Sequence, residues 1–346
     1  MKKTFLYFCL LFIVQTAFAA DSLYVREQQI PILIDRIDNV LYEMRIPAQK
    51  GDVLNEITIQ IGDNVNLSDI QAIRLFYSGV EAPSRKGEHF SPVTYISSHI
   101  PGNTRKALES YSVRQDEVTA PLSRTVKLTS KQPMLKGINY FWVSIQMKPE
   151  TSLLAKVATT IPNAQINNKP IDITWKGKVD ERHVGIGVRQ AGDDGSAAFR
   201  IPGLVTTNNG TLLGVYDIRY NSSVDLQEKI DIGVSRSTDK GQTWEPMRVA
   251  MTFKQTDGLP HGQNGVGDPS ILVDEKTNTI WVVAAWTHGM GNERAWWNSM
   301  PGMTPDETAQ LMLVKSEDDG KTWSEPINIT SQVKDPSWYF LLQGPG

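Results

Sequence analysis

The chain has 346 residues and a formal net charge of -3; 40% of its residues are apolar and 21% are charged. This length favours two domains, and this composition favours packed domains over a disordered chain. The small negative charge gives no basic field for nucleic acid and no polybasic patch for a membrane surface, so neither is an expected partner.

The first segment, MKKTFLYFCLLFIVQTAFAA, has the pattern of a secretory signal peptide. Two lysines precede an apolar run from Phe5 to Val14, and Ala17-Phe18-Ala19 supplies an A-x-A cleavage site. The run is about half of the roughly 20 residues that a transmembrane anchor needs. We therefore expect residues 1–19 to be removed and the protein to be secreted or periplasmic.

The single cysteine, Cys9, lies inside this segment. A lipid anchor on Cys9 is disfavoured because the bulky Phe8 stands where a small residue is expected. After cleavage the mature chain has neither a thiol nor a disulfide, so its stability depends on its packed core. Thiolate catalysis and cysteine-bound metals are excluded for that mature chain.

Residues 20–178 are expected to form an all-β domain, a sandwich of two sheets. NEITIQIGDN and INYFWVSIQM alternate polar with β-branched and aromatic residues, as half-buried strands do, and turn signals separate such runs. KPETSLLAKVATTI is compatible with a short helix, although its valine and threonines favour a strand. The Asp and Asn residues of positions 63–69 lack the glycine and terminal glutamate of an EF-hand, which favours a solvated turn over a calcium loop.

The composition changes after this domain. The sequence that begins with WKGKVDERHVGIG is rich in glycine and charge and poor in core residues. This change places a linker near Lys176–Val184 and the second domain at residues 184–346.

The second half of the chain contains a repeat. SRSTDKGQTWEP and VKSEDDGKTWSEP share the pattern S-x-D-x-G-x-T-W, at Ser237–Trp244 and Ser316–Trp323, and a proline with two apolar strands precedes each. A repeat of short strands with a turn motif at a fixed place is typical of propeller blades. The Asp can cap its own turn and the Gly allows a positive φ, so we expect these boxes to be structural rather than catalytic.

Together these motifs resemble those of sialidases (neuraminidases). The repeat matches their Asp-box, and FRIP at Phe199–Pro202 stands just upstream of the first box, as in that family. The resemblance covers the chain from about Val184 onward. It implies an all-β protein in which an N-terminal β-sandwich precedes the first blades of a six-bladed β-propeller. The sandwich itself is similar to the accessory N-terminal domain of some secreted bacterial sialidases.

The resemblance implies an exo-α-sialidase, whose partners are sialylated glycans and whose reaction retains configuration. Arg200 of FRIP would be one of three arginines that bind the sialic acid carboxylate, because a planar guanidinium donates two parallel hydrogen bonds to a carboxylate. Arg219 would contact a ring hydroxyl. Asp225 would be the general acid/base that protonates the leaving oxygen. Glu228 and Asp231 follow closely in the sequence and remain alternative acids.

Further substrate contacts are implied downstream. Asp268 in GVGDPSILVD corresponds to an aspartate that faces the ring substituents, and Trp286 matches an aromatic residue that lines the N-acetyl pocket. A core position for Trp286 is an equal alternative. Trp296 and Trp297 are candidates for stacking on the glycerol tail or the aglycone, with a solvent-shielding loop cluster as the alternative.

No metal and no cofactor is expected. His261 and His288 are isolated in the sequence, which favours polar loop residues over metal ligands, and there is no HExxH motif.

The sequence departs from the family pattern in its length. About 165 residues follow Val184, enough for three blades at most, whereas six blades need six repeats of roughly 40–50 residues. Sialidases use a Tyr nucleophile activated by a Glu, because the substrate's carboxylate would repel a carboxylate nucleophile. These two residues and two further arginines are expected beyond Gly346. We therefore expect a fragment that is poorly soluble and inactive when expressed alone.

Two other functions remain open. A sialic-acid-binding lectin-like propeller without catalysis would also keep Arg200. A structural Asp-box protein without a sugar site is the third possibility, but the spacing of Arg219 and Asp225 argues against it.

Overall fold

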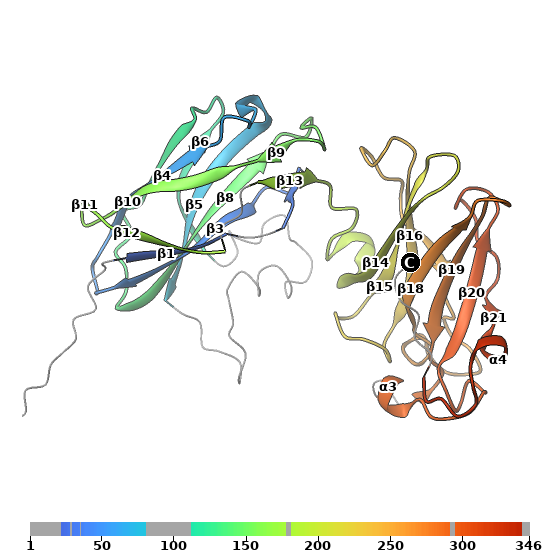
Figure 1. Cartoon of the computed structure of the whole chain (residues 1–346). Helices are drawn as coiled ribbons and strands as arrows, with labels where there is room; N and C mark the ends of the chain where they lie inside the picture. The colour runs from blue at the N-terminus through green and yellow to red at the C-terminus, as the bar shows by residue number, and fades with distance from the viewer. Residues whose placement is uncertain are drawn as a thin grey trace, which may run out of the picture.

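The computed structural model describes residues 22–27, 30–34, 36–80, 112–177, 181–290 and 295–340, with the side chain of Trp296 left out. The predicted signal peptide lies outside the described residues. The described chain is built from strands with a few short helical turns, which confirms the all-β prediction. Figure 1 shows the strands in two groups, one blue to green and one yellow to red. None of the described helices has the length and apolarity needed to cross a membrane.

The N-terminal group contains one large and two smaller sheets. The six-stranded sheet has the order β12-β1-β3-β8-β5-β6. Its strands are β1 (Ser22–Glu27), β3 (Asn39–Ala48), β5 (Ile70–Val80), β6 (Val113–Thr119), β8 (Gly137–Met147) and β12 (Asp172–Lys176). The four-stranded sheet has the order β11-β10-β4-β7, and the three-stranded sheet β2-β13-β9. Their strands are β2 (Ile32–Leu33), β4 (Leu54–Ile61), β7 (Thr125–Thr129), β9 (Lys156–Val157), β10 (Thr159–Ile166), β11 (Lys169–Pro170) and β13 (Arg182–Gly185).

The core of this group lies between sheets, as in a sandwich. Strand β4 contributes Ile57 and Ile59, and β8 contributes Val143 and Ile145; all four side chains are fully buried in one cluster. These residues alternate with polar ones in the sequence, so one face of each strand is apolar. Full burial of each such side chain contributes about 1.5–3 kcal/mol. The stretch KPETSLLAKVATTI forms β9 and β10, so the strand interpretation is the right one there.

The turn at positions 63–69 is a local hydrogen-bonded structure. A 3₁₀ turn, η1 (Leu67–Asp69), begins after Asn66, whose side chain accepts a hydrogen bond from the backbone N–H of Ser68. The side chain of Asp63 is 99% exposed. These contacts are those expected of a solvated, capped turn.

Strand β13 lies within the segment predicted to be a linker. It pairs in parallel with β2 and antiparallel with β9. Arg182 donates two hydrogen bonds to the carbonyl oxygen of Val40, at 2.9 and 3.0 Å, and Val184 is buried in the N-terminal core. Packing of the N-terminal group therefore extends to Gly185, past the predicted domain end at residue 178.

The C-terminal group consists of two four-stranded antiparallel meanders. The first meander has the order β14-β15-β16-β17 and the second β18-β19-β20-β21. The strands are β14 (Ala198–Thr206), β15 (Leu212–Arg219), β16 (Ile230–Ser237), β17 (Arg248–Met251), β18 (Val266–Asp274), β19 (Thr279–Trp286), β20 (Gln310–Ser316) and β21 (Ile327–Asn328). Two short helical turns lie between these strands, η4 (His261–Gln263) and α3 (Ala295–Asn298), while η3 (Asp193–Gly195) precedes β14 and α4 (Thr330–Val333) follows β21. Two meanders with one strand order are what a blade repeat predicts.

The two meanders pack face to face. Val215 and Ile232 of the first meander and Ile271 and Val282 of the second belong to one buried cluster. This shared core holds the two meanders together, so that residues of both can contribute to one site.

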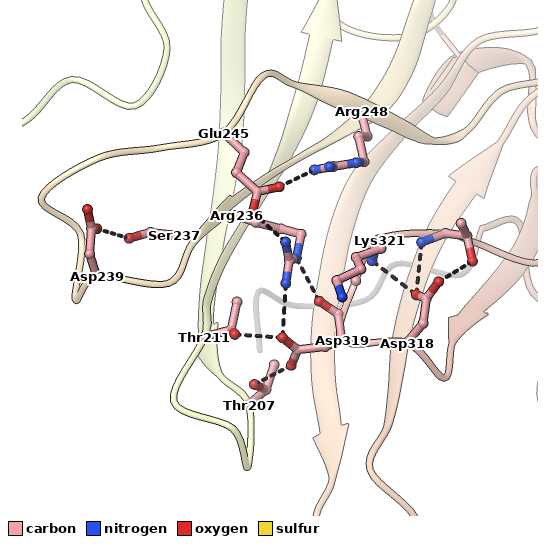
Figure 2. A network of polar contacts seen from close by, with 12 residues as sticks. Thr207, Thr211, Arg236, Ser237, Asp239, Glu245, Arg248, Asp318, Asp319 and Lys321 are labelled. Carbon is pink, nitrogen blue, oxygen red and sulfur yellow. Dashed lines mark hydrogen bonds and ion pairs between the residues drawn. The ribbon is translucent and has the colours of Figure 1, made fainter.

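Each Asp-box forms the turn between the third and fourth strands of its meander. In the first box, Asp239 accepts hydrogen bonds from the Ser237 hydroxyl (2.8 Å) and from the Thr243 backbone N–H and hydroxyl (2.9 and 2.6 Å). The Ser237 hydroxyl accepts from the N–H of Gly241, where φ is 87°. The bonds from Thr243 and Ser237 lower the pKa of Asp239 to about 2. Asp318 makes the equivalent bonds in the second box, and Figure 2 shows both aspartates.

Candidate active site

The FRIP motif lies on a β-bulge in β14. Arg200 is opposite Asp217 on β15, whereas Gly203 is opposite Val215, so β14 contains one extra residue between these pairs. Ile201 takes up the irregularity with a φ of 52°, which is unusual for a β-branched residue. Bulges commonly redirect side chains at functional sites. Here the bulge adjoins Arg200, whose side chain is 42% exposed.

The second meander has the same bulge at the equivalent place. Gly267 lies opposite Ala285 and Ser270 opposite Val283, so β18 also has one extra residue there. Asp268 has a φ of 57° and precedes a proline, as Ile201 does in the first meander. Strained backbone at two repeated positions is a pattern associated with functional sites. It places Asp268 at the position in its meander that Ile201 occupies in the first.

Three of the predicted residues contact one another directly. The Asp225 carboxylate accepts a hydrogen bond from Arg200 Nη1 at 2.8 Å and from Arg219 Nη1 at 2.5 Å through the same oxygen. Both Nη1 atoms also donate to the backbone carbonyl of Ser223, at 3.1 and 3.0 Å. Arg200 and Asp225 are about two-fifths exposed, whereas Arg219 is buried. One carboxylate and two guanidiniums therefore form a single partly exposed cluster.

Asp217 is a fourth member of this cluster and was not among the residues predicted from the sequence. Its side chain is buried and accepts hydrogen bonds from Arg219 Nε (3.0 Å) and Nη2 (2.7 Å). Burial raises the pKa of Asp217 to about 7, while the positive charge and hydrogen bonds of Arg219 act against that rise. The signal was present as D-x-R within a strand, because residues two apart point to the same face.

Asp268 joins the cluster through its backbone and its charge. Its N–H donates to Asp217 Oδ1 at 2.9 Å. Burial raises the pKa of the Asp268 carboxyl, Asp225 adds to the rise, and Arg219 and Arg200 oppose it. The Asp268 carboxyl therefore lies in the electrostatic field of the three predicted residues on the first meander.

The loop that carries Asp225 is attached to the second meander. Gln227 Oε1 accepts hydrogen bonds from the Thr287 hydroxyl (2.7 Å) and the Gly265 N–H (3.3 Å), and Gln227 Nε2 donates to the Thr287 carbonyl (3.1 Å). A Cβ at Gly265 would lie 2.3 Å from the backbone oxygen of Glu228, so only glycine fits there. These contacts hold the Asp225 loop against the edge of the second meander.

The two alternative acids are directed to other partners. Asp231 is buried and accepts hydrogen bonds from the Tyr220 hydroxyl (3.0 Å), while its other oxygen bonds His261 Nε2 (2.8 Å). Glu228 accepts from the Asn221 side chain and from the N–H of Lys229, both at 2.8 Å. Of the three carboxylates, Asp225 is the one that bonds both Arg200 and Arg219.

The two histidines make hydrogen bonds to side chains. His261 contacts Asp231, and the buried His288 bonds Asn264 Oδ1 through Nδ1 at 2.8 Å. Within the described ranges, no three His, Cys, Asp or Glu side chains gather as metal ligands would.

Trp286 lies in the shared core of the two meanders. It is 6% exposed and stacks on Phe253 at a ring-centroid distance of 4.3 Å. Its indole Nε1 is buried and has no hydrogen-bond partner among the described residues. The geometry favours the core alternative for Trp286, and its contact with a sugar stays a prediction. Trp297 is 67% exposed, and the side chain of Trp296 is not among the described side chains, so stacking of either on a substrate stays a prediction.

Comparison with known proteins identifies the family. Residues 20–170 match the model of the N-terminal domain of BNR-repeat neuraminidase, and residues 201–346 match the BNR repeat-like domain. A sialidase of Bacteroides fragilis is 59% identical over an alignment that covers 100% of this chain and 64% of that protein. A sialidase of Paraclostridium sordellii is 35% identical over 38% of this chain and 30% of its own length.

A solved structure extends this likeness to the fold. The Hadza microbial sialidase Hz136 is 62% identical and superimposes with a TM-score of 0.80, covering 93% of this chain and 62% of that one. The chain thus spans slightly less than two thirds of the length of these two similar proteins. On these matches, and on the paired Asp-boxes with the FRIP bulge, the chain belongs to the BNR-repeat sialidase family.

Proposed function

We propose that this chain supplies the sialic-acid-binding arginines and the general acid/base of an exo-α-sialidase. The substrates would be glycoproteins, glycolipids and oligosaccharides that end in sialic acid. The observation that carries the proposal is the direct contact of Asp225 with both Arg200 and Arg219, at 2.8 and 2.5 Å. The family match supports it, because the similar proteins are sialidases.

Arg200 suits recognition of the substrate carboxylate. It is the more exposed of the two arginines, and its guanidinium already holds a carboxylate, that of Asp225. A sialic acid carboxylate would compete with Asp225 for Arg200. The competition would release Asp225 from one of its two cations when substrate binds, and this release would favour uptake of the proton that a general acid must carry.

Arg219 and Asp268 suit recognition of the sugar ring. Arg219 is buried and held by Asp217. Its Nη1 donates to Asp225 and to the Ser223 carbonyl, so a ring hydroxyl would replace one of these two acceptors. The Asp268 carboxyl interacts electrostatically with Arg219 from the second meander. Donors held in place before binding lose little entropy when the substrate arrives. We propose that these two groups contact ring substituents, as the family pattern implies.

The rest of the mechanism stays a prediction from the sequence. It comprises a six-bladed propeller, a Tyr nucleophile with its Glu base, retention of configuration, and two further arginines beyond Gly346. Inactivity of the 346 residues alone is part of the same prediction. Sequencing the encoding DNA past the codon for Gly346 tests it, since these residues must then follow in frame.

We also propose that the protein is exported. The proposal rests on the signal-peptide pattern of residues 1–19. Amino-terminal sequencing of the mature protein should begin at residue 20, and an uncleaved Met1 would contradict the proposal.

Substitution of the acid tests the proposed function. In the enzyme as its gene encodes it, Asp225→Ala should lower kcat for an aryl α-sialoside or sialyllactose by about 10²–10⁴-fold, because a positioned general acid contributes that much. Binding of sialyllactose should survive, because both guanidiniums remain. The matched control is Glu228→Gln in the same loop, which should change kcat less than about twofold.

The outcomes separate the candidate functions. Unchanged turnover in Asp225→Ala would mean that another residue is the acid. A wild-type protein that binds sialyllactose without hydrolysing it would instead be a lectin-like propeller.

A further inference from the structure

Asp217 is a buried ionisable group, paired with Arg219, that the proposed chemistry does not use. It lies on β15 beneath the cluster of Arg200, Arg219 and Asp225, and its side chain is 1% exposed. An ionised carboxylate at such a position carries a large desolvation cost unless it is paired and hydrogen-bonded. The hydrogen bonds of the Asp217 carboxyl show which neighbouring groups it holds in place.

The carboxylate of Asp217 fixes the orientation of Arg219. It accepts from Nε at 3.0 Å and from Nη2 at 2.7 Å, so it engages one edge of the guanidinium with two bonds. That arrangement leaves Nη1 directed to the other side, where it donates to Asp225 and to the Ser223 carbonyl. Because the guanidinium is planar, two bonds on one edge determine where the third nitrogen points.

The same carboxylate also holds the second meander. Asp217 Oδ1 accepts from the backbone N–H of Asp268 at 2.9 Å, next to the bulge at which Asp268 has a φ of 57°. A backbone conformation of this kind persists only when the surrounding structure enforces it. Asp217 therefore bonds one group from each meander, and both groups belong to the proposed sugar site.

We infer that Asp217 is a positioning residue: it sets Arg219 and Asp268, from two different meanders, in the single relative geometry that the proposed sugar site requires. This inference rests on the proposed function. Asp217 itself touches no substrate, since it is buried behind Arg219. Its contribution is to fix the site before the sugar arrives, when a displacement of about 1 Å could cost up to 10²-fold in rate.

The test uses Asp217→Asn in the enzyme as its gene encodes it, assayed with an aryl α-sialoside. The Asn side chain has the same shape as Asp. In the wild type, Asp217 Oδ2 accepts two hydrogen bonds from Arg219, and in the variant either an NH₂ group or a neutral oxygen takes its place. We expect kcat/KM to fall by about 10–100-fold, with KM raised as well. A merely destabilising change would lower the amount of active enzyme, and hence kcat, without changing KM.

A double-mutant cycle with Arg219→Met tests whether Asp217 acts through Arg219. If it does, adding Asp217→Asn to Arg219→Met should lower kcat/KM by less than about threefold further. The guanidinium to be positioned is then already gone, and the amide oxygen of the Asn side chain can still accept from the Asp268 N–H. Full additivity of the two losses, or an unchanged KM in Asp217→Asn, would overturn the inference.

The matched control is Asp319→Asn. Asp319 is a second carboxylate that bonds an arginine of the first meander, Arg236, but it lies in the second Asp-box. Asp319→Asn should lower stability and leave KM within about twofold of wild type. A similar rise of KM in both variants would mean that the effect is general to lost ion pairs, and it would contradict a specific role for Asp217.

A second variant covers the case in which Asp217→Asn does not fold. Asp217→Glu keeps the buried charge and moves the carboxylate by one methylene group, so it should fold and still raise KM. A fully active Asp217→Glu enzyme would overturn the inference. Failure of the proposed function would look different, because the wild-type enzyme itself would then release no sialic acid.

Discussion

Arg219 shows how a single residue of the site is made possible by its neighbours. Its guanidinium is almost completely buried, and removing one partner of such a buried pair typically costs 3–5 kcal/mol. Asp217 bonds its inner edge and Asp225 its outer nitrogen, so the cation has a carboxylate on both sides. The inner carboxylate supplies rigidity, and the outer one is the proposed acid.

The sequence leaves a sugar contact and a core position as equal alternatives for Trp286, and the structure places it in the core. Its stacking on Phe253 and its burial assign it to the shared core of the meanders, where its Nε1 bonds no polar group of the described ranges. Trp286→Phe should therefore lower the free energy of unfolding by about 1–2 kcal/mol, since lost ring contacts outweigh removal of an unsatisfied donor. KM should stay within about twofold of wild type. Chemical denaturation and steady-state kinetics measure the two quantities.

The matched control for Trp286 is Trp323→Phe in the second Asp-box, since the Trp323 Nε1 is also buried and also lacks a hydrogen-bond partner in the part of the chain that the structure describes. The two variants should behave alike. A fivefold rise in KM for Trp286→Phe, without such a rise for Trp323→Phe, would instead support the N-acetyl pocket predicted for Trp286.

At the scale of elements, the second Asp-box joins the two meanders. Figure 2 shows Asp319 between the first meander's threonines and Arg236. Asp319 accepts from the hydroxyls of Thr207 and Thr211, both at 2.6 Å, and from Arg236 Nη2 at 3.0 Å, while its carbonyl accepts from Arg236 Nε at 2.7 Å. Burial raises the pKa of Asp319, but the bonds from Thr207, Thr211 and Arg236 outweigh it and lower the pKa overall.

Asp319→Ala should lower the free energy of unfolding by about 2–4 kcal/mol, because it leaves Arg236 Nη2 and two threonine hydroxyls without the carboxylate that accepts from them. The control is Lys240→Ala, at the same position of the first box. Lys240 is exposed and has a φ of 61°, close to the 66° of Asp319, so both substitutions place alanine in the same strained conformation. Equal losses, measured by urea unfolding, would show that backbone strain rather than the bonds of Asp319 determines the effect.

At the scale of the whole molecule, the end of the N-terminal unit can be tested by truncation. A chain of residues 20–178 lacks β13, whereas a chain of residues 20–186 keeps it. We expect the shorter chain to be less stable by about 2–4 kcal/mol, since it loses the burial of Val184 and the hydrogen bonds of Arg182 to Val40. Urea unfolding of both chains measures the difference.

The control for this truncation is Val184→Ala in the longer chain, which should lose about 1–3 kcal/mol of the same stability. Equal stability of the two truncated chains would support the boundary expected from composition at residue 178.

Much of the architecture could be predicted from the sequence, because its causes are local. Period-two alternation marks the strands of the N-terminal group, and the turn chemistry of S-x-D-x-G-x-T-W operates within eight residues. Arg200, Arg219 and Asp225 were named from the family resemblance, and all three lie within one hairpin and its loop. Their contacts at 2.8 and 2.5 Å are therefore local in the sequence, while their catalytic roles stay predictions.

What the tertiary structure decided depends on partners that are far apart in the sequence. Asp217 became recognisable as the link between the meanders only when Asp268, 51 residues away, was seen to donate to it. Trp286 was ambiguous because a tryptophan at the end of a strand can face a core or a pocket, and Phe253 settles its packing. The composition of the segment that forms β13 predicts a linker, because the strands that pair with it, β2 and β9, lie elsewhere in the sequence. Local chemistry thus determined the elements, and the resemblance of the motifs to sialidases supplied the candidate residues, whereas long-range pairing and the two bulges determined which of those residues meet.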